Sequence, residues 1–239
     1  MEYNNIRRLL SCARRAADEY HMIEEGDRIA VGISGGKDSI ATLCTLDALR
    51  RFYPKSFSLM GITVDMGLPG MDFSPVEAFF ERAQIPYRRV ETELAHIIFD
   101  VRKESNPCSL CAKMRRGILH DAVLEAGFNK IALGHHFDDV VDTFMLNLLH
   151  EGRLGSFSPV THLSRKNITM IRPMILAQEK DIRYFLNHNE LPVVRSACPE
   201  DKNTEREAMK ELLHDLEHRY KGVRHRIFVA MQKAHLDGY

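Results

Sequence analysis

An apolar run followed at once by a glycine-rich polar loop is the feature that most restricts how this chain can fold. Residues 29–33 (Ile-Ala-Val-Gly-Ile) have the composition of a buried parallel strand, and residues 40–43 (Ile-Ala-Thr-Leu) that of a helix start. Between them lies the string Ser34-Gly35-Gly36-Lys37-Asp38-Ser39. A strand, a glycine turn and a helix in succession begin a βα unit, and such units build parallel sheets.

The same alternation continues along the chain. Strands are predicted at 28–33, 58–64, 87–90, 130–134, 168–172 and 193–194, with helices up to residue 52 and at 75–83, 112–126, 138–150 and 179–189. Amphipathic helices are predicted at 4–20 and 205–220, with a shorter one at the C-terminus. The fold class is therefore α/β, a doubly wound and mostly parallel sheet with N- and C-terminal helices. We divide it into a helical segment (1–27), a loop-bearing domain (28–200) and a helical tail (201–239).

The loop at 34–39 has the chemistry of a phosphate site. Two glycines let the backbone approach a ligand closely, and free N–H groups at a helix start attract anions. Lys37 adds a full positive charge, and Ser34 and Ser39 add hydroxyl donors. The spacing is neither that of a Walker A loop nor G-x-G-x-x-G. A plain tight turn is the alternative, and the complete string with Asp38 beside Lys37 disfavours it.

Composition sets wider limits. With 239 residues, a hydrophobic fraction of 44% and zero formal net charge, the chain can bury a core but can bind nucleic acid only through a local basic patch. No stretch is apolar enough to span a membrane, and the N-terminus lacks the apolar core of a signal peptide. We expect a cytoplasmic protein without a membrane partner, in which the five cysteines serve as thiols, metal ligands or catalysts.

Two cysteines stand in a C-x-x-C motif, Cys108-Ser109-Leu110-Cys111, just before a predicted helix. A helix start lowers thiol pKa and favours the ligating thiolate. The motif alone fits a redox dithiol, half a zinc site or half an iron–sulfur site. Cys198 lies among polar residues and is a further candidate ligand or a stray thiol, whereas Cys12 and Cys44 fall in apolar helical patterns and are expected in the core.

Further candidates gather at the predicted carboxyl edge of the sheet. His135, Asp138 and Asp139 follow the strand at 130–134, and Asp65 follows the strand at 58–64. Ligands of such sheets bind beyond this edge. The histidine and the carboxylates suit metal binding or acid–base work, two roles the sequence does not separate. The simpler alternative is that Asp138 caps its helix with His135 packed beneath.

Basic residues beside the C-x-x-C motif are the candidate RNA contacts. Lys113, Arg115 and Arg116 lie within one predicted helix, although charge runs on helices are often only solvated faces. The segment 152–156 (Gly-Arg-Leu-Gly-Ser) is either a mobile loop that closes over substrate or an ordinary connection.

Together these motifs resemble a known family. Residues 34–39, 108–111, 115–117 (Arg-Arg-Gly), 132–139, 171–173 (Ile-Arg-Pro) and the late Cys198 occur in the order found in tRNA 2-thiocytidine synthetases of the TtcA type, a branch of the PP-loop ATP pyrophosphatases. The resemblance covers about residues 28 to 206. The related 2-thiouridine synthetases carry terminal zinc-binding cysteine pairs that are absent here.

The resemblance implies an enzyme that uses ATP, Mg²⁺ and a 4Fe-4S cluster to thiolate a cytidine of the tRNA anticodon loop. By position, the cluster ligands are Cys108, Cys111 and Cys198. Asp38 would hold Mg²⁺ and Lys37 would offset phosphate charge. The nucleotide contacts are the loop residues Ser34, Gly35, Gly36, Lys37, Asp38 and Ser39, with Val64, Asp65 and Gly134; the catalytic candidates are Lys37, Asp38, His135, Asp138 and Asp139.

The chemistry expected from this resemblance begins with transfer of AMP to the C2 oxygen, which makes it a leaving group. Three thiolates leave one iron without a cysteine, and we hypothesise that this iron holds the sulfide that displaces AMP. The hypothesis fails if sulfide added to reconstituted enzyme changes neither the cluster spectrum nor the yield of thiolated product. The sulfur donor would be free sulfide or a cysteine desulfurase, and a homodimer is expected.

Other functions remain open at this stage. The base could be uridine, as in the 2-thiouridine branch, or the loop could serve an amidating synthetase that activates carboxylates. A passive nucleotide sensor or an electron carrier would also need the loop, and a structural zinc site would also need the cysteines. A brown colour in anaerobically purified protein would distinguish an iron–sulfur cluster from zinc.

Overall fold

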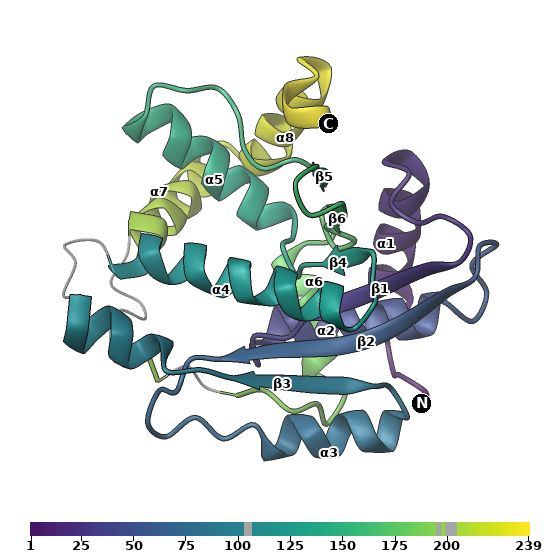
Figure 1. The fold of residues 1–239 in the computed structure, drawn as a ribbon. Coiled ribbons are helices and arrows are strands. Elements are labelled where there is room, and N and C mark those ends of the chain that lie inside the picture. The colour runs from purple at the N-terminus through teal and green to yellow at the C-terminus, as the bar shows by residue number, and fades with distance from the viewer. Residues whose placement is uncertain (103–106, 195–196, 199–204) are drawn as a thin grey trace.

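The computed structural model describes residues 1–102, 107–194, 197–198 and 205–239. Its strands form a six-stranded sheet in the order β3-β2-β1-β4-β6-β5 (Figure 1). The strands are β1 (Asp27–Gly32), β2 (Phe57–Asp65), β3 (Tyr87–Glu91), β4 (Lys130–Ala132), β5 (Val160–Leu163) and β6 (Ile168–Ile171). All neighbours pair in parallel except β5 and β6. The predicted fold class is confirmed, and the antiparallel edge strand β5 was not predicted.

Helices connect and cover these strands. They are α1 (Arg7–Glu19), α2 (Lys37–Leu49), α3 (Ser74–Ala83), α4 (Pro107–Glu125), α5 (Phe137–His150), α6 (Glu179–Asn187), α7 (Glu205–Arg219) and α8 (Val223–Lys233), with a short π-helix, η1 (His96–Arg102), and a 3-10 turn, η2 (Leu236–Gly238). No helix of the described residues is long and apolar enough to cross a membrane. The C-x-x-C motif lies inside α4, and the prediction that it precedes the helix is therefore wrong.

Alternating strand residues divide the core into two layers. Ile29 and Val31 of β1 face the large cluster that also contains Leu9 of α1 and residues of α2, α3, α5, α6, α7 and α8. Ala30 points to the other face, where it packs with Val123 of α4. Helix α4 crosses this second face (Figure 1). The terminal helices therefore share the core of the sheet, and the predicted boundary at 200–201 lies outside the described residues.

The predicted strand at 193–194 does not form, because these residues pair with a loop. The backbone N–H of Val194 donates to the carbonyl of Gly35 at 2.9 Å, and residues 191–194 have no regular structure. This contact brings the segment that leads to Cys198 against the glycine loop that follows β1.

The connection between α5 and β5 is held in place by the C-terminal residues. Ser156 N–H donates to Asp237 Oδ2 at 2.6 Å, and the Tyr239 hydroxyl donates to the carbonyl of Phe157 at 2.8 Å. The Tyr239 ring in turn packs edge-on against Tyr20, next to the end of α1. These contacts support the interpretation of 152–156 as a fixed connection.

Candidate functional site

Hydrogen bonds among its own residues shape the loop between β1 and α2. Gly36 N–H donates to Ser34 Oγ at 3.2 Å, and the Ser39 hydroxyl donates to the Gly36 carbonyl at 2.8 Å. Gly35 has a φ of +83°, and a Cβ there would lie 2.9 Å from Val194 Cβ. Only glycine fits, since the backbone is left-handed and the space is filled. Gly36 is the N-cap of α2, so the unpaired N–H groups of the first helical turn lie at this loop.

A second glycine lets the end of β4 approach the same loop. A Cβ on Gly134 would lie 2.9 Å from the carbonyl carbon of Asp38 and 3.0 Å from the backbone nitrogen of Ser39. Backbone atoms cannot move aside as a flexible side chain can, so any side chain here would displace α2. Because β1 and β4 are neighbours where the strand order reverses, the loop lies at the point where doubly wound sheets bind ligands.

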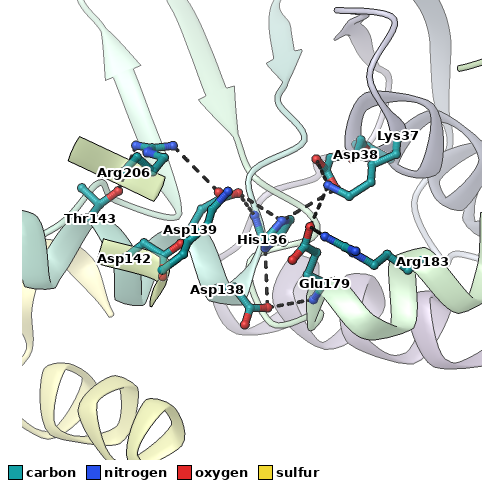
Figure 2. A network of polar contacts seen from close by, with 12 residues as sticks. Lys37, Asp38, His136, Asp138, Asp139, Asp142, Thr143, Glu179, Arg183 and Arg206 are labelled. Atoms are coloured by element: carbon teal, nitrogen blue, oxygen red, sulfur yellow. Dashed lines mark hydrogen bonds and ion pairs between the residues drawn. The ribbon is translucent and has the colours of Figure 1, made fainter. Parts of the chain in front are cut away.

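Lys37 and Asp38 form an ion pair that extends to α6 (Figure 2). Lys37 Nζ lies 2.9 Å from Asp38 Oδ2 and 2.9 Å from Glu179 Oε1. Arg183 donates to the same Glu179 oxygen at 3.0 Å. Burial raises the pKa of the Glu179 carboxyl, but Lys37 and Arg183 outweigh it and lower that pKa to about 2. Asp38 Oδ1 is buried and has no hydrogen-bond partner among the described residues.

His136 lies among the carboxylates shown in Figure 2. Its ring nitrogens lie 3.7 Å from Asp38 Oδ1, 3.7 Å from Asp138 Oδ2 and 3.5 Å from Asp139 Oδ2. The backbone N–H of His136, the residue just before α5, donates to Asp139 Oδ2 at 3.0 Å, so the Asp139 side chain caps the start of α5. Asp138 Oδ2 instead accepts the Glu179 N–H at 2.7 Å and thereby caps α6. The alternative in which Asp138 caps its own helix is wrong.

A cavity of about 580 Å³ opens above the carboxyl ends of the strands. This volume falls within the range of roughly 300–1,000 Å³ found for small-molecule sites. The cavity extends from Ile62 and Val64 on β2, past the glycine loop, to His135 and Arg172 beyond β4 and β6. The predicted site residues that line it are Ser34, Asp38, Ser39, Val64, Gly134, His135, Asp139, Arg115 and Arg116.

Several predicted residues do not line this cavity. They are Gly35, Gly36, Lys37, Asp65, Asp138 and Lys113. The Asp65 carboxylate lies 2.6 Å from Arg89 Nη2 and accepts the Gly67 N–H at 2.9 Å, so it fixes the turn after β2. Lys113 is exposed on α4.

His135 presents an uncharged ring to the cavity. Burial, with a further contribution from the positive charge of nearby Arg172, lowers the pKa of His135 to about 4. The ring packs against Phe157 with centroids 4.7 Å apart, and its Nδ1 is buried without a partner among the described residues. At neutral pH the ring can therefore either donate or accept a hydrogen bond at Nδ1, depending on its tautomer.

The structure brings the cysteines of the motif close to Cys198. Burial raises the pKa of the Cys111 thiol, Arg115 lowers it, and Cys198 and Cys108 lie near enough to raise it again. Val194, bonded to Gly35, is four residues from Cys198, a separation of at most about 14 Å of chain. The thiols therefore lie near both one another and the glycine loop.

The three thiols offer the donor atoms that iron–sulfur clusters use. No group of at least three His, Cys, Asp or Glu side chains in the described part of the chain is arranged to hold one metal ion. An iron–sulfur cluster makes a different demand, since each thiolate binds its own iron atom and the sulfurs are spaced more widely. The soft thiolate donors suit iron–sulfur chemistry.

Three residues of the site are not among the predicted ones. Glu179 carries no motif, and its contact with Lys37 appears only in the folded chain. Phe157 lies in an irregular connection, although it lines the cavity. Arg172 was visible as a charge at the end of an apolar run, 168–171, which indicates a buried cation with a special role.

Comparisons with known proteins agree with this geometry. The family model described as a PP-loop domain matches residues 8–216. The tRNA-cytidine(32) 2-sulfurtransferase of Syntrophotalea carbinolica is 39% identical over 214 residues, which cover 88% of this chain and 83% of that protein. The protein of the same name from Yersinia pestis is 35% identical over 247 residues, which cover 100% and 79%.

Solved structures show the same fold. The U34-tRNA thiolase NcsA from Methanococcus maripaludis, solved with its 4Fe-4S cluster, has a TM-score of 0.77 and 24% identity, and covers 96% of this chain and 79% of that one. The NH3-dependent NAD synthetase from Campylobacter jejuni has a TM-score of 0.52 and 13% identity, with 100% and 97% covered.

A nucleotide-sized cavity above a glycine loop at the sheet's switch point defines a PP-loop nucleotide-binding protein. Within that class, the chain belongs to the tRNA-cytidine(32) 2-sulfurtransferase family. The family resemblance in the sequence is thereby confirmed.

Proposed function

We propose that this protein uses ATP to replace O2 of the cytidine at position 32 of tRNA with sulfur. The observation that carries the proposal is the 39% identity, over 88% of the chain, to a protein named for that reaction. In the first step, O2 forms a bond to the α-phosphorus of ATP and pyrophosphate leaves. In the second, sulfur forms a bond to C2, and the C2–O2 bond breaks as AMP leaves with that oxygen.

The glycine loop would bind the phosphates. The start of α2 presents unpaired N–H groups, and the hydroxyls of Ser34 and Ser39 lie beside them. Lys37 would turn from its carboxylate partners to the departing pyrophosphate and offset its charge. Adenine would lie between Val64 of β2 and Leu119 of α4, which face the same cavity. Fixed donors of this kind stabilise charge without reorganisation.

Asp38 is the proposed Mg²⁺ ligand. Its Oδ1 is a buried carboxylate oxygen without a hydrogen-bond partner among the described residues, and such an oxygen is the hard donor that Mg²⁺ requires. Mg²⁺ commonly takes one or two protein carboxylates and completes its shell with phosphate and water. One carboxylate oxygen beside the phosphate loop that accepts no hydrogen bond from the described residues fits that pattern.

His135 and Asp139 are the proposed groups at the reacting base. Both line the cavity next to Gly134. The uncharged His135 ring can accept the proton that an incoming hydrosulfide must lose, and Asp139, on the first turn of α5, would stabilise the charged ring. Asp138 would act indirectly, because its carboxylate holds the start of α6 and thus Glu179.

Cys108, Cys111 and Cys198 are the residues that would hold a 4Fe-4S cluster. When bound, the cluster would supply the centre that delivers sulfur to the activated carbon. Arg115 lies near enough to Cys111 to lower the pKa of its thiol and also lines the cavity, so it links the thiols to the nucleotide site. Arg116 and the exposed Lys113 extend this positive surface toward the RNA.

The sulfur donor, sulfide or a cysteine desulfurase, and the homodimer stay predictions. The test of the main proposal is mass spectrometry of tRNA nucleosides from cells with and without the gene. We expect 2-thiocytidine to disappear with the gene, to return with the wild-type copy and to stay absent with Lys37→Ala. Loss of 2-thiouridine with 2-thiocytidine intact would overturn the assignment of the base.

A further inference from the structure

The end of the cavity beyond β4 and β6 contains a buried cation that no part of the nucleotide chemistry uses. Arg172 follows β6, is 6% exposed and lines the cavity. In the sheet order, β6 is three strands from β2, which is about 14 Å at a strand spacing of about 4.8 Å. Adenosine above β2, with its phosphates at the loop after β1, leaves this end of the cavity to the second substrate.

Arg172 is firmly held but only partly satisfied. Its Nη1 donates to the carbonyl of Ser158 at 2.5 Å and to Thr161 Oγ1 at 3.3 Å, and the guanidinium lies over the Phe157 ring, 4.9 Å from its centroid. Its Nε is buried without a partner in the described part of the chain. A buried donor left unpaired costs free energy, and a ligand that accepts from it would recover that cost.

No described carboxylate compensates the charge of Arg172. Burial lowers the pKa of Arg172. Tyr239 raises this pKa in part, and the positive charge of Arg116 lowers it again. Arginine nevertheless stays protonated and offers only donors. The guanidinium of Arg172 therefore gives this cavity wall a fixed hydrogen-bond donor that cannot act as an acceptor.

We infer that Arg172 recognises the base to be modified by donating to N3 of cytosine, an inference that rests on the proposed function. N3 of cytosine accepts a hydrogen bond, whereas N3 of uracil carries a hydrogen. Uridine would place donor against donor at the buried Nε of Arg172, and sites built to hydrogen-bond one substrate group discriminate strongly against an analogue that cannot pair with it. His135 has its proposed role at the incoming hydrosulfide, so selection of cytidine over uridine falls to Arg172.

The test changes one atom of the substrate. tRNA carrying 3-deazacytidine at the target position has a C–H in place of N3. We expect the wild-type holoenzyme to thiolate it with kcat/KM lower by about 10- to 100-fold than for cytidine. Arg172→Gln should lower kcat/KM for cytidine and show little further loss with 3-deazacytidine. Equal losses from the deaza substitution in wild type and Arg172→Gln would overturn the inference.

Uridine at the target position gives an independent readout. A glutamine can accept from N3–H, so Arg172→Gln should narrow the cytidine-to-uridine ratio of kcat/KM by at least tenfold. Arg116→Gln, on an exposed arginine of the same cavity, should affect both tRNAs equally. Narrowing of the ratio to the same extent in Arg116→Gln would contradict the assignment to Arg172.

Folding is controlled separately. Affinity for a non-hydrolysable ATP analogue reports an intact site, and Arg172→Lys, which keeps the cation, replaces Arg172→Gln if the latter does not fold. We then expect the loss of kcat/KM caused by 3-deazacytidine to be smaller in Arg172→Lys than in wild type, because an ammonium lacks the planar set of donors of a guanidinium. An equal loss in the two proteins would overturn the inference. Wild-type enzyme that thiolates no cytidine would instead defeat the proposed function.

Discussion

The ammonium of Lys37 and the carboxylate of Glu179 lie 2.9 Å apart, so a residue on α6 holds the lysine of the phosphate-binding loop. Asp138 fixes the backbone of the same glutamate by accepting a hydrogen bond from its N–H. A phosphate that binds to the loop must compete with this carboxylate for the lysine. The contact therefore sets how readily the loop accepts its ligand.

Replacing Glu179 with glutamine removes the competing charge. We expect Glu179→Gln to bind pyrophosphate about fivefold more tightly in the absence of divalent cations, since partly exposed ion pairs contribute up to about 1 kcal/mol. Isothermal titration calorimetry measures this directly. Arg183→Gln is the matched control, because it removes the exposed partner of Glu179 but leaves the contact with Lys37. Weaker binding by Glu179→Gln would show that the glutamate positions the lysine for phosphate.

The approach of β4 to the glycine loop predicts an effect of a single methyl group. Gly134→Ala would place Cβ 2.9 Å from a backbone carbon of Asp38. We expect a loss of about 1–3 kcal/mol in the free energy of unfolding, as for other overpacked sites, together with weaker nucleotide binding. Gly117→Ala, within α4 and with nothing within 4 Å of the new Cβ, should stabilise the protein by up to about 1 kcal/mol. Urea unfolding of both variants checks the contrast, which fails if Gly134→Ala is as stable as wild type.

The cysteine assignment predicts which thiols hold iron. After anaerobic reconstitution, Cys108→Ser, Cys111→Ser and Cys198→Ser should each lose most of the iron and the visible absorbance of wild type. Cys12→Ser, on the half-buried face of α1, should retain both. Full iron content in Cys198→Ser would remove that residue from the set of ligands.

The uncharged state of His135 predicts a pH dependence of stability. The unfolded ring binds a proton below its ordinary pKa of 6.5, whereas the folded ring does so only below about 4. Between these values the unfolded state binds more protons, so the stability contributed by the neutral ring is lost as pH falls from 6.5 to about 4. His135→Asn should flatten this part of the profile of unfolding free energy against pH. Parallel profiles for the two proteins would mean that His135 does not titrate as described.

Local patterns in the sequence predicted the features that depend on neighbouring residues. The apolar run before residue 34 and the string 34–39 determine the strand, the turn and the helix start without help from distant residues. The strand and the turn form as predicted, whereas α2 begins at Lys37, inside the string, and not at residue 40. Buried parallel strands such as β2 have continuous apolar composition and are visible for the same reason. The spacing of the thiol motif indicated a redox or a metal-binding pair, and only the family resemblance favoured an iron–sulfur cluster.

Contacts between distant segments could not be predicted in this way. Asp138 and Glu179 are 41 residues apart, and the residues around neither of them indicate that Asp138 caps the helix that begins at Glu179. The valines at 193–194 have strand composition, yet Val194 pairs with Gly35 because the loop offers the free carbonyl. The edge strand β5 has only four residues, is partly exposed and lacks a strong alternation, so its pattern was too weak to predict it.

The hydrogen bonds from the connection that carries Phe157 to Asp237 and Tyr239 link residues far apart in the sequence to one wall of the cavity. Phe157 supports both His135 and Arg172, so the wall of the cavity is fixed only when residues 236–239 have docked. Asp237 and Tyr239 do not themselves line the cavity. A substitution at either residue would therefore act on His135 and Arg172 together, through the position of Phe157.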